Sequence, residues 1–231
     1  MDETKNIDEE VVEEVEEINE KDLDETESEE EETKKEVSFG KKLIAKDTFR
    51  FSVRDICEMA IFCALAIVFD TFCKIDVGFE GGSINFAMFP LFIIALRQGW
   101  FKGFIAGAFV FGIITCIIDE DGKLAVYFLD YFVAFGSVGI LGVLKPVITD
   151  DYYNVTWHSY AFSAVGIVAA YIVRFFAATL DGILFYGTDL LGSIIYNAPY
   201  IFASMVIVLA LFLGLLVIIL KTFRTHNTKS L

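Results

Sequence analysis

Long apolar stretches follow one another along the chain from about residue 55 onward, separated by short polar segments. A helix that crosses a lipid bilayer needs about 20 mostly apolar residues, because each helical residue adds about 1.5 Å. Hydrophobic residues make up 55% of the chain, above the ~45–50% that is usual in soluble domains. The pattern predicts an all-α membrane protein with six transmembrane helices, at 56–72, 83–96 (short), 101–118, 124–144, 160–180 and 198–220.

Acidic residues are concentrated at the N-terminus. Residues 1–38 contain 19 acidic residues and 4 lysines, which accounts for the whole formal net charge of −15. Such a segment buries too little apolar surface to offset chain entropy, so we expect a disordered acidic tail. A transient or partner-docking helix is the alternative, because Val11, Val12, Val15 and Ile18 have helical spacing. We divide the rest into a basic juxtamembrane segment (39–54), a six-helix transmembrane domain (55–220) and a C-terminal tail (221–231).

Lysine and arginine are distributed unevenly between the two sides of this arrangement. Eleven fall on the side that holds both termini, the 97–102 turn and the 145–159 loop, and only Lys74 and Lys123 fall on the other. Cytoplasmic segments of membrane proteins carry the excess of basic residues. We therefore predict a multi-pass protein of the bacterial plasma membrane with both termini in the cytoplasm and outward loops at 73–82, 119–123 and 181–197.

The sequence contains little that indicates catalysis or a resident metal. Its four cysteines form no CxxC pair, and its two histidines, His158 and His226, lie in polar flanks of the apolar segments. The sequence lacks HExxH, GxGxxG and P-loop motifs as well. We expect a protein that is not an enzyme, has no cofactor and binds no nucleic acid. Any ATP that it uses must be hydrolysed by another chain.

Ionisable residues inside predicted spans are the first candidates for function, because an unpaired charge in lipid is costly. They are Glu58, Asp70, Asp130, Arg174 and Asp181. Counting about 1.5 Å per residue from the predicted helix ends places Asp130 and Arg174 at similar depths in the outer half of the membrane. They are either a structural ion pair or part of a binding site. Glu58 lies near the cytoplasmic end of the first span. Its side chain can extend from there to water, which is enough to explain its presence.

Aromatic residues accompany Asp130 on the predicted outer side. A carboxylate among aromatic rings suits a flat organic cation, and an asparagine amide suits the edge of a heterocycle. The alternative is an interfacial aromatic belt, which we favour for Tyr127 alone. For Asp130 and Tyr131 we favour a binding site. The other aromatic members of the cluster are Phe185, Tyr186 and Tyr196, and Asn197 adjoins them in the sequence.

Small residues recur at four-residue spacing on two predicted spans. Ala60 and Ala64 form such a step on the first, and Gly99, Gly103 and Gly107 on the third. Stripes of small residues allow helices to approach closely. They serve either internal packing or the docking of a partner subunit, and the spacing alone favours internal packing.

Several short motifs in order resemble the substrate-binding S components of energy-coupling factor (ECF) transporters, and most closely the thiamine-specific ThiT/YuaJ family. The similarity covers about residues 52–220. The motifs are Gly81-Gly82-Ser83-Ile84-Asn85-Phe86, Met88-Phe89-Pro90, Ala95-Leu96-Arg97-Gln98-Gly99, Gly103 to Gly112, Asp130-Tyr131, Arg174 to Gly182, and Tyr196-Asn197.

The resemblance implies a mechanism and partners. An S component binds its vitamin from outside, and then associates with a transmembrane coupling protein (EcfT) and two ATPase subunits, which drive release of the vitamin inside. In that family an AxxxA motif on the first span contacts the coupling protein. Ala60 and Ala64 match it, so the resemblance favours docking for this pair.

The resemblance also implies a binding site. It assigns substrate binding to Asp130, Tyr131, Arg174, Gly182, Tyr186 and Asn197. Asp130 replaces a typical glutamate, Tyr186 an indole, Ala178 a histidine and Gly192 a tyrosine. The ligand is therefore thiamine, a precursor such as its pyrimidine moiety, or another heterocyclic vitamin. The alternative function is a stand-alone ion-coupled secondary transporter, and a scaffold or intramembrane enzyme ranks below both.

Overall fold

The computed structural model describes residues 49–76, 82–119, 126–149 and 155–227. All of them belong to one compact unit, Ala45–Leu231. The acidic tail (1–38), most of the basic segment that follows it, and the last four residues lie outside the described residues, so the predictions for those segments stay untested.

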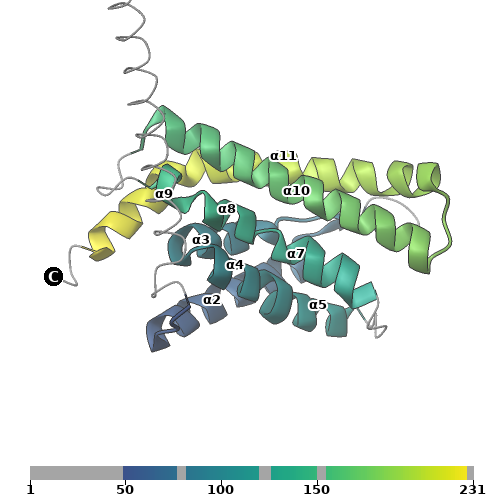
Figure 1. The fold of residues 1–231 in the computed structure, drawn as a ribbon, viewed down its shortest axis with the longest axis horizontal. Helices are drawn as coiled ribbons and strands as arrows, with labels where there is room; N and C mark the ends of the chain where they lie inside the picture. The colour runs from purple at the N-terminus through teal and green to yellow at the C-terminus, as the bar shows by residue number, and fades with distance from the viewer. Residues whose placement is uncertain (1–48, 77–81, 120–125, 150–154, 228–231) are drawn as a thin grey trace, which may run out of the picture. The chain divides into compact units, whose positions relative to one another are not determined.

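Helices make up almost all of the described chain (Figure 1). A short antiparallel hairpin of β1 and β2 separates the first two helices, and pairs Ile75 with Ile84 and Asp76 with Ser83. In chain order the elements are α2 (Val53–Phe72), β1 (Ile75–Asp76), β2 (Ser83–Ile84), α3 (Met88–Gln98), α4 (Trp100–Ile105), the π-helix η2 (Ala106–Phe111), α5 (Gly112–Ile118), the π-helix η3 (Tyr127–Val133), α7 (Ala134–Gly136), α8 (Gly139–Val143), α9 (Lys145–Ile148), α10 (Trp157–Phe185) and α11 (Leu190–Asn227).

Within the described residues, three helical segments are long and apolar enough to cross a membrane: Trp100–Ile118, Trp157–Phe185 and Leu190–Thr222. Met88–Gln98 and Tyr127–Val143 are apolar but shorter. Large apolar side chains such as Ile61, Val165 and Val206 are about 60% exposed, which suits helices that face lipid hydrocarbon instead of water. The chain is a helical membrane protein, and six spans with cytoplasmic termini stay a prediction.

The core lies where α3 meets the two long helices, α10 and α11, which run side by side (Figure 1). Phe92 of α3 lies against Tyr171 of α10 and Phe212 of α11, with ring centroids 6.3 and 6.2 Å apart. All three side chains are fully buried. Aromatic rings at this distance and tilt pack favourably beyond their buried area, so they fix the central helix against the long pair.

Side-chain caps define where two of the helices begin. Ser52 and Asp55 form a reciprocal capping box at the start of α2, and Thr156 and Ser159 form another at the start of α10. Each box satisfies backbone N–H groups that the first helical turn leaves without partners. The Ser159 hydroxyl also donates to the carbonyl oxygen of Ile148, at 2.8 Å, and so ties the start of α10 to α9.

The second predicted span begins later than the sequence indicated. Ser83 and Ile84 pair with the strand after α2, and the helix starts only at Met88. The prediction of a helix from residue 83 was therefore wrong, because apolar periodicity cannot distinguish a short paired strand from the first turn of a helix. The all-α class itself is confirmed, because the hairpin of two two-residue strands is a small exception in a chain whose described elements are otherwise helical.

The fourth predicted span, 124–144, is interrupted in its described part. It consists of η3, α7 and α8, with turn residues Ser137 and Val138 between the last two. The π-helix η2 packs closely against α7 here, since a Cβ atom at Gly107 of η2 would collide with the carbonyl group of Phe135. The Tyr127 hydroxyl donates to the carbonyl oxygen of Ala108, at 2.9 Å, and links η3 to η2.

The glycine stripe of the third span packs inside the protein. A Cβ atom at Gly103 would lie 2.6 Å from the Cβ atom of Ala95, and Gly107 meets Phe135. Internal packing, the reading that the spacing alone favoured, is confirmed for these two positions. Gly99 serves a different purpose, because its φ of 96° forms the turn between α3 and α4.

The outer segment predicted at 181–197 is mostly helical. α10 continues to Phe185 and α11 begins at Leu190, which leaves only residues 186–189 as a connection. The loop prediction was wrong here because its polar residues face the neighbouring helix. The Ser193 hydroxyl, for example, donates to the carbonyl oxygen of Thr179 at 2.9 Å. Gly187, with a φ of 66°, supplies the turn.

Candidate functional site

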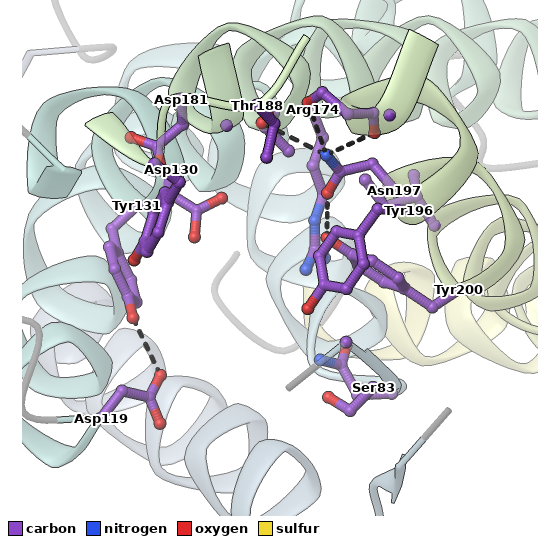
Figure 2. Close-up of a pocket in the computed structure, with 18 of the residues that line it drawn as sticks. Ser83, Asp119, Asp130, Tyr131, Arg174, Asp181, Thr188, Tyr196, Asn197 and Tyr200 are labelled. Atoms are coloured by element: carbon purple, nitrogen blue, oxygen red, sulfur yellow. Dashed lines mark hydrogen bonds between the residues drawn. The ribbon is translucent and has the colours of Figure 1, made fainter. Parts of the chain in front are cut away.

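A cavity of about 790 Å³ lies at the end of the helices where α10 turns into α11. Its walls come from the end of α2, the segment around β2, η3, the last turns of α10, the connection to α11 and the first turns of α11. Its volume falls in the range of small-molecule sites, about 300–1,000 Å³. Figure 2 shows the labelled side chains converging on this space from both sides.

Acidic side chains outnumber basic ones in the cavity wall. Among the described wall residues, two are basic, Lys74 and Arg174, and five are acidic, Asp70, Asp119, Asp130, Asp181 and Asp189. Low-dielectric walls lined by one sign of charge focus the electric field and concentrate ligands of the opposite sign. The cavity is therefore suited to a cation.

The π-helix η3 carries the acidic–tyrosine pair that the sequence singled out. Asp130 is half-buried, and the adjacent Tyr131 is 5% exposed. The Tyr131 hydroxyl donates to Oδ2 of Asp119, at 3.0 Å, and this bond connects η3 to the end of α5 (Figure 2). Single π-helical turns within α-helices are frequent at functional sites, because the extra residue redirects the side chains.

Asn197 anchors the opposite wall, at the start of α11. Its Nδ2 atom lies 3.0 Å from the carbonyl oxygen of Ser193 and 3.4 Å from that of Ala178. Its Oδ1 atom accepts a hydrogen bond from the hydroxyl of Tyr200 (Figure 2). Asn197 is 4% exposed. These bonds fix the amide and hold α11 against α10, so Asn197 positions the wall while it lines the cavity.

Gly182 allows α10 and α11 to approach closely beside Asn197. A Cβ atom at this position would lie 2.5 Å from Oγ of Ser193 and 3.2 Å from Oγ1 of Thr188. Oγ of Ser193 also lies 3.3 Å from Nδ2 of Asn197. The glycine therefore leaves room for the hydrogen bonds that orient the asparagine.

Arg174 reaches the cavity from the middle of α10. Its guanidinium carbon lies 4.6 Å from the centroid of the Phe135 ring, a cation–π contact. Its Nη1 atom is buried and has no hydrogen-bond partner among the described residues. An aromatic face thus holds the cation in place, and one of its nitrogen atoms keeps its capacity to donate.

All six residues to which the sequence assigned substrate binding line this one cavity: Asp130, Tyr131, Arg174, Gly182, Tyr186 and Asn197. Tyr196 lines it too, whereas Tyr127 and Phe185 of the predicted aromatic cluster are not in its wall. Ala178 and Gly192 also lie in the wall. Their small side chains enlarge the space next to Asn197.

Several wall residues were missed by the sequence reasoning. Asn85 sits within a predicted span, where its polarity was the one available signal, and Asp119 follows directly after an apolar run. Tyr200 and Ser193 carried no signal that separates them from ordinary helix residues. In the part of the chain that the structure describes, no group of three or more His, Cys, Asp or Glu side chains is arranged to hold a metal ion.

Comparison with known proteins identifies the family. The family model of the thiamine transporter protein (Thia_YuaJ) matches residues 56–225. This chain belongs to the thiamine transporter family. The match covers every described wall residue of the cavity, and confirms the resemblance noted from the sequence motifs.

Two individual relatives agree with membership of the thiamine transporter family. The thiamine transporter ThiT of Bacillus subtilis (strain 168) is 29% identical over 161 residues, which are 65% of this chain and 83% of the relative. The solved structure of ThiT from Listeria monocytogenes is similar in fold, with a TM-score of 0.63 and 22% sequence identity. That similarity covers 74% of this chain and 97% of the other.

Proposed function

We propose that this member of the thiamine transporter family takes up thiamine, and that it binds thiamine in the cavity between η3, α10 and α11. The observation that carries the proposal is the charge of the cavity wall, whose described residues include five aspartates and two basic residues. Thiamine is a permanent cation with two flat rings. A negative cavity with aromatic side chains supplies both the charge and the ring contacts that such a ligand needs.

Each wall residue that the sequence singled out has a role in this proposal. Asp130 supplies the charge and accepts from the ligand, and Tyr131 and Tyr186 offer ring faces. Arg174 offers an N–H donor to a ring nitrogen, since its buried Nη1 atom has no partner in the described part of the chain. Asn197 and Gly182 shape the wall through their contacts with Ser193.

A binding measurement tests this proposal. Neither Trp100 nor Trp157 lines the cavity, so calorimetric titration of the detergent-purified protein is preferable to tryptophan fluorescence. We expect saturable binding of thiamine, weakened about 10- to 100-fold in Asp130→Asn, because a charge-assisted hydrogen bond contributes about 1.5–3 kcal/mol. Glu58→Gln removes a carboxylate outside the cavity and serves as the control.

The ligand panel decides between the open alternatives. It contains thiamine, its pyrimidine precursor, riboflavin and biotin. Binding of the precursor or of another vitamin in preference to thiamine would change the substrate and keep the site. Absence of binding across the whole panel would rule out the proposal.

We further propose that uptake requires an ECF coupling protein and two ATPase subunits, and that Ala60 and Ala64 form the docking surface. Both alanines are exposed on α2, next to Ile61, which is 66% exposed. Small exposed residues at four-residue spacing are the surface that a close helix–helix contact needs. In this arrangement both termini of the chain are cytoplasmic, and the cavity opens outward.

Reconstitution into proteoliposomes with the coupling subunits tests the docking surface. Ala60→Leu and Ala64→Leu should abolish ATP-dependent thiamine uptake while thiamine binding in detergent is unchanged. Val165→Leu, on an exposed position of α10, should leave uptake unchanged. Normal uptake by both alanine variants would refute docking at this surface. Uptake by the protein without any ATPase subunit would instead favour an ion-coupled secondary transporter.

A further inference from the structure

The two π-helices, η2 and η3, are connected by the side chain of Tyr127. In an α-helix the N–H of Gly112 would donate to the carbonyl oxygen of Ala108, four residues earlier. At the end of η2 it bonds instead to the carbonyl oxygens of Gly107 and Phe109. The carbonyl group of Ala108 thus loses its α-helical donor, and the hydroxyl of Tyr127 donates to it, at 2.9 Å. Because Ala108 is fully buried, this bond satisfies an acceptor that would be costly to leave unpaired.

The π-helix η3 has the same kind of turn at the residues that form the cavity wall. The N–H of Ala134 bonds to the carbonyl oxygens of Leu129 and Tyr131. It bypasses the carbonyl oxygen of Asp130, which an α-helix would use. One extra residue in a turn rotates the side chains beyond it by about 100°, because an α-helix has 3.6 residues per turn. The directions of Asp130 and Tyr131, which both line the cavity, therefore depend on this turn.

Close packing joins the two turns. A Cβ atom at Gly112, the residue that follows η2, would lie 3.4 Å from the carbonyl oxygen of Tyr131. Aromatic rings add to this contact, since Phe132 of η3 lies against Phe104 and Phe109, with ring centroids 5.4 and 5.2 Å apart. Reversion of η2 to α-helical bonding would rotate Gly112 and turn one of its larger neighbours toward Tyr131. A packed backbone has no room for such a side chain, so η3 would have to shift.

We propose that Tyr127 is a positioning residue for the binding site: its hydroxyl holds η2 in the π-helical form, and the contact between η2 and η3 keeps Asp130 directed into the cavity. The proposal rests on the proposed function, because it concerns the same site. Tyr127 is not among the wall residues of the cavity, so it acts through the backbone and not by contact with the ligand. The affinity for the ligand then falls with the fraction of molecules that lose the π-helical form.

The first test measures thiamine affinity by calorimetry on the full-length protein, on Tyr127→Phe and on Tyr160→Phe. Tyr127→Phe keeps the ring and removes only the hydroxyl. Tyr160, near the start of α10, is the control, because it is also a partly buried tyrosine outside the cavity wall. Tyr127→Phe should weaken binding about three- to tenfold, the range expected for one hydrogen bond, and Tyr160→Phe should leave it unchanged. Unchanged affinity in Tyr127→Phe overturns the inference and leaves the proposed function intact.

A double-mutant cycle with Asp130→Asn distinguishes positioning from a general loss of stability. If Tyr127 acts through the direction of Asp130, Tyr127→Phe should cost less than about twofold in the Asp130→Asn background, because the contact that it positions is already weakened. A loss that is merely structural is the same in both backgrounds. An equal loss of affinity in the two backgrounds therefore overturns the inference.

Hydrogen exchange of the wild-type protein provides a test that needs no variant. None of the described wall residues belongs to η2. Thiamine should nevertheless slow the exchange of the η2 amides, because binding favours the form in which η2 and η3 are both π-helical. The helix α8, which also lies outside the described wall, is the reference and should be protected less. Equal protection of η2 and α8 overturns the inference, and absence of thiamine binding overturns it together with the proposed function.

Discussion

The molecule contains two polar regions, and they treat their charges differently. The first, which we term the charge cluster, surrounds the α3–α4 turn and consists of Arg54, Asp55, Glu58, Arg97, Gln98, Lys102 and Lys145. There, the carboxylates face cations of the chain itself: Lys102 lies 2.8 Å from Asp55, and Arg97 lies 2.7 Å from Glu58. The second region is the cavity, where Asp119 and Asp70 accept from a hydroxyl and an amide.

This difference separates a structural role from a binding role. In the charge cluster the ion pairs join the start of α2 to α3 and α4, and Lys145 of α9 donates to the carbonyl oxygen of Arg97 at 2.5 Å. In the cavity, a hydroxyl and an amide orient Asp119 and Asp70 without neutralising them, and aspartates outnumber basic residues in the described wall, which a cationic ligand can use. Substitutions in the cluster should therefore change stability without changing affinity, and those in the cavity should do the reverse.

The largest effect is expected from Asp55→Ala in the charge cluster. Lys102 is 6% exposed, and loss of its carboxylate leaves a buried charge without compensation, which costs about 3 kcal/mol. The variant also loses half of the capping box of α2. Thermal unfolding in detergent should shift strongly downward while the affinity for thiamine is unchanged. The double variant Asp55→Asn/Lys102→Met removes both charges and should recover much of the lost stability. An unchanged melting temperature in Asp55→Ala would contradict a structural role of the ion pair between Asp55 and Lys102.

A smaller effect, on affinity, is expected from Gly182→Ala in the cavity. The added Cβ would lie 2.5 Å from Oγ of Ser193 and would displace the hydrogen bonds that orient Asn197. We expect a loss of about tenfold in thiamine affinity, which corresponds to ~1.4 kcal/mol. Gly214→Ala, also in a long helix but outside the cavity wall, is the matched control, because a Cβ atom there would have no neighbour within 4 Å. Equal losses of affinity in both variants would show that the loss does not come from the contact between the added Cβ atom and Ser193.

The sequence alone predicted the residues of the cavity better than the boundaries of the helices. Asp130 was recognisable because ionisable residues within apolar spans are rare and costly. Tyr131 and Asn197 were recognisable because they accompany aromatic residues on the predicted outer side and match motifs of the family. Their convergence was expected from the family resemblance, and the structure places all three around one cavity. The helix starts at Met88 and Leu190 were missed, because apolar periodicity does not register a two-residue strand or polar residues that face a neighbouring helix.

Two further features depend on tertiary contacts that no local pattern encodes. Glu58 was expected to do no more than reach water, but it accepts from Arg97, 39 residues later in the chain, and lies in the charge cluster. Asn85 was interpreted only as part of a family motif, but its side chain and its backbone are held by Asp70 and Ser204, which lie on two other helices. Pairings over such sequence separations follow from the packing of α2, α3 and α11.

A pH dependence provides a third test, centred on Lys145 of the charge cluster. This residue follows the fourth predicted span, and burial, together with the nearby charges of Lys102 and Arg97, lowers its pKa from 10.5 to about 8. Between these two values the unfolded chain binds more protons than the folded protein, so stability should rise with pH across this window and be lowest below it. A rise of about 1 kcal/mol, or a few degrees in melting temperature, is expected between pH 7.5 and 9.5. Lys145→Met should remove most of this rise, and an equal rise in the variant would assign it to other groups.

The smallest effect is expected from Tyr131→Phe, which sharpens the distinction between the two regions. The substitution keeps the ring in the cavity wall and removes only the hydroxyl that donates to Asp119. A hydrogen bond between a neutral donor and a charged acceptor orients the carboxylate without neutralising it, so we expect a loss in thiamine affinity of about three- to fivefold. Calorimetry on Tyr131→Phe and on Asp119→Asn separates the two contributions. Asp119→Asn removes negative charge from the cavity as well, and should weaken binding more than Tyr131→Phe does. If the tyrosine variant weakens binding as strongly as the aspartate variant, the orientation of Asp119 matters more than its charge, and this part of the wall does not act through its negative charge.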